Sequence, residues 1–428
     1  MRIGLLEFFL ILVIAAITVG PTAALWLERW VRRANRNSAA AARRRAAQQA
    51  QRIAEREAVL HRFQVVGLAF AVFMAVGLVY ALVLRPIEST PKPYTAPAVR
   101  ESTAPAAQPG GELAPGEYRN ISCVRRQGDW LYFSAQDKSG TGLVLRMRED
   151  GSGLATVLTA AGEITGFDFD AEGNLWLTLL TASGGALCRA GYDGWGATLE
   201  QVVTQMDGRT LTGLSAVAAG PDGRIYFAQV AQASAPEGLE AALRTELMAH
   251  TATGSVYVYD PAARTVQRVL DGIAGASGLA LSPDGETLYV SDLGSRCIWA
   301  VSPEGRELTA GGKNCGVFAD SLPGYPGALA AAGDGTVSIG YRWAYSGWLE
   351  SHAGGTLLRG AALRLSQSMQ EGLFRLPASA PAAEALSADG VPQRVFTGRE
   401  LGSAAAVCPA GSRVYLGGAD GSLHWLRI

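Results

Sequence analysis

The sequence lacks the short motifs that mark common hydrolases, zinc enzymes and nucleotide-binding proteins. It contains no Gly-x-Ser-x-Gly, no zinc-ligand spacing and no phosphate-binding loop. Its four histidines are scattered, at positions 61, 250, 352 and 424. The formal net charge is −1, and the basic residues concentrate near the N-terminus. The rest of the chain is mildly acidic, which excludes nucleic acid as an expected partner.

The dominant feature of the sequence is a short pattern that recurs six times along residues 128–417. Each copy is a glycine followed by a short apolar run, and four copies have Asp or Glu just before the glycine. An acid–glycine pair suits a tight hairpin turn, because glycine tolerates positive φ. A period of about 40–50 residues built from four short strands is typical of a β-propeller. The six glycines, which predict six blades, are Gly128, Gly173, Gly223, Gly285, Gly335 and Gly411.

The sixth copy is incomplete, because the chain stops at Ile428 before an outer strand. A propeller must close to avoid open strand edges. We therefore expect a segment just before Tyr118, near Glu112 and Leu113, to supply the missing strand.

Two of the repeat spacings are longer than the others. Gly223 and Gly285 are 62 residues apart, and Gly335 and Gly411 are 76 apart. These spacings locate insertions at about 231–253 and 341–370, both with helical patterns. Loop decoration is one interpretation of the insertions, and a lid or partner surface is the other.

The N-terminal part of the chain has a different character. Phe8–Leu27 and Val65–Leu84 are uncharged runs of twenty residues, each long enough to cross a hydrocarbon core of about 30 Å. Residues 28–63 between them hold ten Arg and no Lys. An Arg-rich connector stays on the cytoplasmic side, which places both termini outside. A cleaved signal peptide is the alternative for the first run.

We therefore predict an all-β six-bladed β-propeller preceded by an α-helical two-span transmembrane hairpin. The domains are a first transmembrane helix (1–27), a cytoplasmic Arg-rich helical connector (28–63), a second transmembrane helix (64–85), a Pro/Ala-rich periplasmic linker (86–117) and the propeller (118–428). The linker holds seven prolines, which predict an extended, semi-rigid spacer. High Ala and Arg content indicates a bacterium, and hence a two-pass inner-membrane protein with a periplasmic propeller.

Five cysteines, an odd number, all fall in the propeller. The periplasm permits disulfides. Cys297 and Cys315 flank a hairpin and form the candidate pair, if they face each other across adjacent strands. Cys123 and Cys408 lie on the innermost strands of the first and last blades, where buried free thiols are the favoured interpretation. Cys188 is left without a partner.

Residues from about Leu239 to Ile428 carry three further motifs in a fixed order. They are Thr253-Gly-Ser-Val-Tyr-Val-Tyr-Asp-Pro, Ser277-Gly-Leu-Ala-Leu-Ser-Pro-Asp-Gly and Phe318-Ala-Asp-Ser-Leu-Pro-Gly-Tyr-Pro. This order resembles the strictosidine synthase-like propellers, a group that includes the adipocyte plasma membrane-associated protein and is related to the gluconolactonase/regucalcin enzymes. The resemblance implies a divalent cation, usually calcium, at the bottom of the central channel.

The positions that the resemblance assigns to the polar cluster have lost their carboxylates and amides. A hard cation needs oxygen ligands, especially carboxylates. We therefore expect a narrow, apolar channel with no metal, no cofactor and no catalytic residue. The degenerate positions are Ser215, Ala216, Ser277, Gly327 and Ala406, together with Ile121 or Ser122 on the first inner strand.

Three aspartates are the alternative channel carboxylates. Asp292 is a weak candidate for a calcium ligand, and Asp168 and Asp170 are two more positions in the second repeat. For each of the three, capping of a turn or strand end is the favoured interpretation.

Three functions fit these observations. The first is a non-catalytic binding or scaffold propeller, or an accessory subunit of an inner-membrane complex, with lipid and other membrane or periplasmic proteins as partners. The second is a divergent strictosidine synthase-like or lactonase-type hydrolase that uses calcium. The third is a periplasmic ligand sensor that signals through the hairpin.

Overall fold

The computed structural model describes residues 39–102, 104–114, 118–191, 198–373, 381–398, 401 and 403–428. The chain divides into two compact units, Met1–Pro86 and Ile87–Ile428. The first predicted span, residues 1–27, lies outside the described residues.

The first unit contains one long helix. α2 spans Ala39–Val79 and continues as a short π-helix, η1, over Tyr80–Leu84. Its Ala, Arg and Gln residues have high helix propensity, which accounts for its length. Within it, Val59–Leu84 is 26 residues long and apolar enough to cross a membrane. The described part of the predicted connector and the predicted second transmembrane helix (64–85) therefore form one continuous helix. Val59–Leu84 is the one candidate span among the residues that the structure describes.

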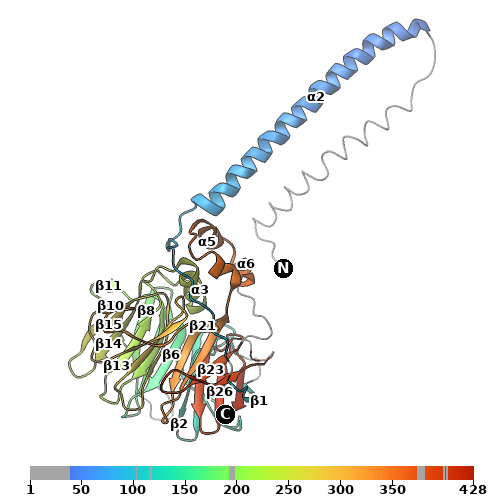
Figure 1. Cartoon of the computed structure of the whole chain (residues 1–428). Helices are drawn as coiled ribbons and strands as arrows, with labels where there is room; N and C mark the ends of the chain where they lie inside the picture. The colour runs from blue at the N-terminus through green and yellow to red at the C-terminus, as the bar shows by residue number, and fades with distance from the viewer. Residues whose placement is uncertain are drawn as a thin grey trace. The chain divides into compact units, whose positions relative to one another are not determined.

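The second unit is a ring of six antiparallel sheets, the blades of a β-propeller (Figure 1). The strands of each blade are given from the innermost to the outermost. Blade 1 consists of β2 Val124–Gln127, β3 Trp130–Gln136, β4 Gly142–Arg148 and β5 Ala155–Ala160, and blade 2 of β6 Glu163–Phe169, β7 Leu175–Thr181, β8 Gly184–Ala190 and β9 Leu199–Val203. Blade 3 consists of β12 Leu214–Ala219, β13 Ile225–Gln229, β14 Gly254–Asp260 and β15 Thr265–Ile273.

Blades 4 to 6 repeat this order. Their strands are β16 Ala276–Leu281, β17 Leu288–Asp292, β18 Cys297–Val301 and β20 Gly316–Ala319; β21 Gly324–Ala331, β22 Val337–Ala344, β23 Ala383–Leu386 and β24 Pro392–Phe396; β25 Ala406–Ala410, β26 Arg413–Gly417, β27 Leu423–Arg427 and β1 Gln108–Ala114. Two short strands, β10 Gln205–Met206 and β11 Arg209–Thr210, form a small hairpin, and β19 Leu308–Thr309 pairs in parallel with β15.

The six repeated glycines all lie in the turn between the first and second strands of a blade. Their φ angles are positive, from 57° at Gly128 to 84° at Gly335. An L-residue with a side chain rarely adopts this conformation, so the glycine fixes the turn and the register of each hairpin. The prediction of six blades from six glycine turns is confirmed.

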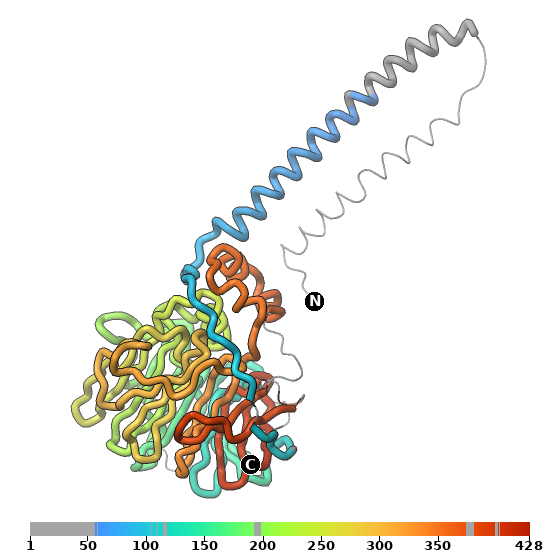
Figure 2. Tube along the Cα trace, viewed as in Figure 1, coloured from blue at the N-terminus to red at the C-terminus, as the bar shows by residue number. Residues whose placement is uncertain are grey.

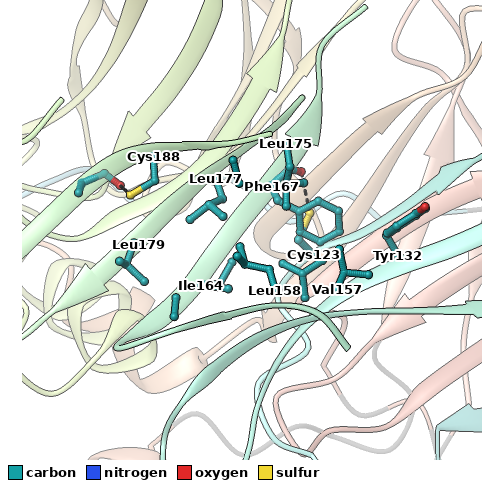
Figure 3. Close-up of a cluster of buried hydrophobic side chains, with 14 residues drawn as sticks. Cys123, Tyr132, Val157, Leu158, Ile164, Phe167, Leu175, Leu177, Leu179 and Cys188 are labelled. Atoms are coloured by element: carbon teal, nitrogen blue, oxygen red, sulfur yellow. Dashed lines mark hydrogen bonds between the residues drawn. The ribbon is translucent and has the colours of Figure 1, made fainter. Parts of the chain in front are cut away.

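Apolar side chains from neighbouring sheets form the core. Between blades 1 and 2, Val157 and Leu158 pack against Phe167, Leu175 and other side chains of the next sheet (Figure 3). Each such side chain contributes about 1.5–3 kcal/mol when fully buried. The core therefore consists of layers between blades, and each blade needs both neighbours.

Ring closure is provided by β1, which lies before the first blade in the sequence. β1 pairs antiparallel with β27, with Glu112 opposite His424. The outermost strand of blade 6 thus comes from the segment predicted for it, near Glu112 and Leu113. The prediction of closure by residues before Tyr118 is confirmed.

The predicted spacer is not free of the propeller. We call residues 87–107, described except for residue 103, the strap. Its backbone amides at Lys92, Tyr94 and Arg100 donate to the carbonyls of Ala249, Ala353 and Ser321, at 2.8, 3.1 and 2.6 Å. An extended, proline-rich chain makes no internal hydrogen bonds, so its polar backbone groups can pair with another surface. The expectation of a spacer over 86–117 is therefore wrong, and the compact unit begins at Ile87 rather than at 118.

Helices occupy both predicted insertions. α3 (Leu239–Ala249) lies in the first, and α4 (Gly347–Ser351), α5 (Leu357–Ala362) and α6 (Gln367–Gly372) lie in the second. The strap runs beside them and then toward blade 6 (Figure 2).

Gly110 allows us to test the role of β1 in closing the ring. A Cβ atom at this position would lie 1.8 Å from the backbone oxygen of Trp425, so alanine must push β1 away from β27. We expect Gly110→Ala to lower the free energy of unfolding by about 1–3 kcal/mol. Denaturant unfolding of the full-length protein in detergent measures this change.

Gly333→Ala is the matched control, since a Cβ at Gly333 meets nothing within 4 Å. Equal stability of the two variants would show that β1 does not contribute to closure.

Candidate functional site

The central channel is lined by the innermost strands of all six blades. Its cavity volume is about 20 Å³, room for roughly one water molecule. The lining residues include four of the predicted degenerate positions, Ser215, Ala216, Ser277 and Ala406. The structure therefore brings these positions together, as the resemblance implied.

The channel hydroxyls are used to join neighbouring blades. Ser215 Oγ donates to the carbonyl of Ala276 in blade 4, at 2.7 Å, and Ser277 Oγ donates to the carbonyl of Pro326 in blade 5, at 2.8 Å. These bonds satisfy the hydroxyl protons within the protein. The two serines thus link blade 3 to blade 4 and blade 4 to blade 5.

Two further serines make the same kind of contact. Ser122 Oγ, at the channel, donates to the carbonyl of Ile164 in blade 2, at 3.1 Å. Ser291 Oγ, on the second strand of blade 4, donates to the carbonyl of Gly327, the fifth degenerate position, at 2.8 Å. Serine hydroxyls therefore link blade 1 to blade 2, blade 3 to blade 4 and blade 4 to blade 5.

One charged pair also borders the channel. Arg125, which lines the cavity, lies with its Nε 3.4 Å from Asp168 Oδ1. The Asp168 carboxylate also accepts from the amides of Phe169 and Ala219, both at 3.0 Å. The expectation of an apolar channel is therefore wrong at Arg125. Sequence reasoning missed this residue because one arginine on a strand carries no motif.

The other candidate carboxylates serve as local caps. Asp292 is buried and accepts from the Ser295 amide and from Trp299 Nε1, both at 3.0 Å, and its burial raises the pKa of the carboxyl. Asp170 accepts from the Asn174 amide and Trp176 Nε1, both at 2.8 Å. Both carboxylates therefore accept hydrogen bonds from groups three to seven residues further along the chain. Among the residues that the structure describes, no group of three or more His, Cys, Asp or Glu side chains is placed to hold a metal ion.

All five cysteines are free thiols. The β18–β20 register places Ala300 opposite Gly316, so Cys297 and Cys315 lie at opposite ends of the strand pair and do not face each other. The proposed disulfide between them is therefore wrong. Burial raises the pKa of Cys188 to about 12 and that of Cys408 to about 11, which keeps both thiols protonated and unreactive. Cys188 lies among apolar side chains in Figure 3.

Helix α3 crosses one end of the channel. Glu163, at the start of the innermost strand of blade 2, accepts from the amide of Leu239 at the N-terminus of α3, at 2.9 Å. Arg342 of blade 5 lies with its Nε 3.3 Å from Glu240 in the same helical turn. Blades 2 and 5 face each other across the axis of a six-membered ring, so this turn spans the axis. We call α3 the lid because its first turn contacts both of these blades.

The strap is held to the lid and its neighbouring helices by a buried arginine on α5. Arg359 is fully buried, and its guanidinium donates to the carbonyls of Met248 and Ala353, both at 3.0 Å, and to that of Lys92 in the strap. One cation thus joins the end of α3, the second insertion and the strap. Planar guanidinium donors suit several carbonyls at once, which a lysine cannot match.

A second buried arginine makes a similar contact further along the strap. Arg296 Nη1 donates to the carbonyl of Leu322 at 2.6 Å, and its Nη2 donates to the carbonyls of Pro97 and Ala98. Its Nε lies 3.4 Å from Glu350 Oε1, with both side chains almost fully buried. Loss of one partner from a buried pair costs about 3–5 kcal/mol, so Glu350 helps to keep the Arg296 guanidinium in place.

Part of the propeller is similar to a known family. Residues 178–339, from β7 to β22, match the family described as SMP-30/Gluconolactonase/LRE-like region. The match extends from blade 2 into blade 5 and includes the lid. No curated protein matches the sequence.

Solved structures of related shape support the same fold. A gluconolactonase from Xanthomonas campestris is 20% identical, with a TM-score of 0.51 over 81% of this chain and 100% of that one. A luciferin-regenerating enzyme is 15% identical, with a TM-score of 0.51 over 75% and 95%. Regucalcin from Agrobacterium tumefaciens, a calcium-binding protein, is 13% identical, with a TM-score of 0.48 over 76% and 95%. At these identities the first two show the propeller fold alone.

His250 gives the lid a defined response to pH. It stacks on Tyr94 of the strap, with ring centroids 3.8 Å apart, and burial, together with the nearby cations of Arg359 and Lys92, lowers its pKa to about 4. Below pH 6.5 the unfolded chain protonates this histidine while the folded protein does not. The free energy of unfolding therefore falls as the pH drops from about 6.5 to 4, by up to about 3 kcal/mol.

We expect His250→Phe to remove this dependence while keeping an aromatic ring beside Tyr94. Denaturant unfolding of both proteins between pH 7 and 4 measures it. Burial raises the pKa of Glu246 to about 7, so this residue raises the free energy of unfolding as the pH drops. Glu246 is present in both proteins, so its effect cancels in the comparison. His352→Phe is the control. Parallel pH profiles for His250→Phe and the unmodified protein would contradict the prediction.

Proposed function

We propose that the protein is a non-catalytic binding propeller, a scaffold or accessory subunit of a membrane complex. The single observation that supports this proposal is the use of the channel serines to join neighbouring blades. Ser122, Ser215 and Ser277 each donate to a carbonyl of the next blade.

The chemistry of cation binding gives this observation its weight. A dication that sheds its water needs several anionic or carbonyl oxygens that converge on it, and burying an ion without them is costly. Serine hydroxyls are neutral, and Asp168 already accepts from two amides and lies beside Arg125. The lid over the channel further limits access by a substrate. Binding at the outer surface therefore explains the architecture better than chemistry in the channel.

A lactonase-type hydrolase is the second candidate, and the family match favours it. Residues 178–339 belong to a region type named after gluconolactonase, and the channel retains Arg125 and Asp168. In this alternative, calcium binds near the channel or near Asp292, and the lid must open for substrate to enter.

Calcium binding separates the two candidates. We expect calorimetric titration of the full-length protein in detergent to show no calcium affinity tighter than roughly 100 μM, well inside the range of weak extracellular calcium sites. We also expect no calcium-dependent hydrolysis of gluconolactone. The hydrolase would replace the scaffold proposal if calcium binds tightly and the protein hydrolyses gluconolactone. In that case Asp168→Asn or Asp292→Asn should abolish hydrolysis, whereas the control Asp334→Asn, in an exposed turn, should leave it unchanged.

We further propose that the protein is anchored in a bacterial inner membrane by two spans, with the propeller in the periplasm. The apolar helix Val59–Leu84 and the Arg-rich residues that precede it support this proposal. If the basic connector is in the cytoplasm and the propeller is in the periplasm, the helix between them must cross the membrane.

Cysteine labelling in the Cys315→Ser background tests this topology. We expect Gln49→Cys to react only after the inner membrane is opened to the reagent. Val391→Cys, on a side chain that is 54% exposed, should react from the periplasm. Labelling of both positions from the same side would refute the arrangement.

A further inference from the structure

The second insertion exposes an apolar surface that the propeller leaves uncovered. Leu357 and Leu358, adjacent at the start of α5, are 66% and 50% exposed, and Met369 of α6 is 39% exposed. We call these three side chains the cap face. α6 lies against the end of α5, since Gln370 Nε2 donates to the carbonyls of Leu363 and Leu365 at 3.3 and 3.2 Å. Two adjacent leucines this exposed indicate a surface that another apolar phase covers.

Charge is nearly absent from the solvent side of the same insertion. Of the four charged side chains within residues 347–373, Glu371 is exposed and lies 3.6 Å from Arg244, and Arg364 is half-buried and donates to the Gly360 carbonyl at 2.7 Å. Arg359 and Glu350 of this insertion are buried. Ser366, Gln367 and Ser368, which are exposed and uncharged, surround Met369. Such a surface can approach an apolar phase without desolvating a charge.

The strap connects this surface to the apolar helix. Pro91 of the strap lies 3.8 Å from the position of a Cβ on Gly360 of α5, and the Lys92 carbonyl accepts from Arg359. The apolar stretch Val59–Leu84 ends seven residues before Pro91. A link of this length spans at most about 25 Å, even when fully extended. A bilayer that holds the apolar helix therefore lies within reach of α5.

We propose that the cap face rests on the surface of the lipid bilayer, with Leu357 and Leu358 inserted among the headgroups and upper acyl chains. The inference rests on the membrane attachment proposed above. Short helices that present apolar side chains from an otherwise polar surface bind at this level of a bilayer. Half-buried Trp348 and exposed Tyr345, next to the same insertion, are the aromatic types enriched there. Contact with lipid would hold the lid side of the propeller toward the membrane and leave the opposite side open to partners.

Fluorescence quenching by lipid tests the proposal on the full-length protein. Leu357→Cys in the Cys315→Ser background is labelled with an environment-sensitive fluorophore. The protein is placed in nanodiscs of phosphatidylethanolamine and phosphatidylglycerol, with a small fraction of lipid carrying a nitroxide near the headgroup. We expect at least threefold stronger quenching, with a blue-shifted emission, than at Val391→Cys or Leu154→Cys, whose side chains are 54% and 49% exposed. Leu358→Cys serves as the second position if Leu357→Cys does not fold.

Each other outcome overturns the inference. Equal quenching at Leu357→Cys and the two controls would show that the cap face does not contact lipid. Self-quenching between labelled copies without lipid quenching would assign the face to a second copy of the chain. Alkaline carbonate extraction is performed first. Release of the protein from membranes at that step would refute the membrane attachment itself, which is a distinguishable failure.

Discussion

The pairing of β1 with β27 is the interaction on which the rest of the second unit depends. The outermost strand of blade 6 comes from residues that precede blade 1. The ring therefore cannot close until β1 pairs with β27. That pairing also fixes the end of the strap, whose amide at Ala107 donates to the Val395 carbonyl of blade 5 at 2.9 Å. The strap is consequently part of the propeller, although its composition is that of a linker.

Buried arginines then connect the strap to the lid. Arg296 and Arg359 are both fully buried, and main-chain carbonyls accept most of their donors. A buried guanidinium is costly unless its donors are satisfied, so these carbonyls must stay where they are for the charge to be tolerated. The positions of α3, the second insertion and the strap are thereby coupled. Movement of the lid would require the strap contacts to change with it.

This coupling has a functional consequence for the channel. Glu163 and Arg342 hold the first turn of α3 from opposite blades, and the channel below that turn has room for about one water molecule. Serine hydroxyls join blade 1 to blade 2, blade 3 to blade 4 and blade 4 to blade 5. The first turn of α3 and the packed inner strands together leave little open volume at the axis.

The resemblance to known propellers implied the convergence of Ser215, Ser277 and Ala406, and the sequence by itself determined the number of blades, the closing segment and the insertions. Local rules are enough for these features, because a glycine turn sets each hairpin and the repeat order sets which strands line the axis. Only the tertiary structure decided that the proline-rich segment is a strap, that α3 is a lid and that Arg125 borders the channel. Each of these depends on contacts between residues far apart in the chain, such as Arg359 with Lys92 and Glu163 with Leu239. Composition and spacing do not specify such contacts, since they depend on which surfaces ring closure brings together.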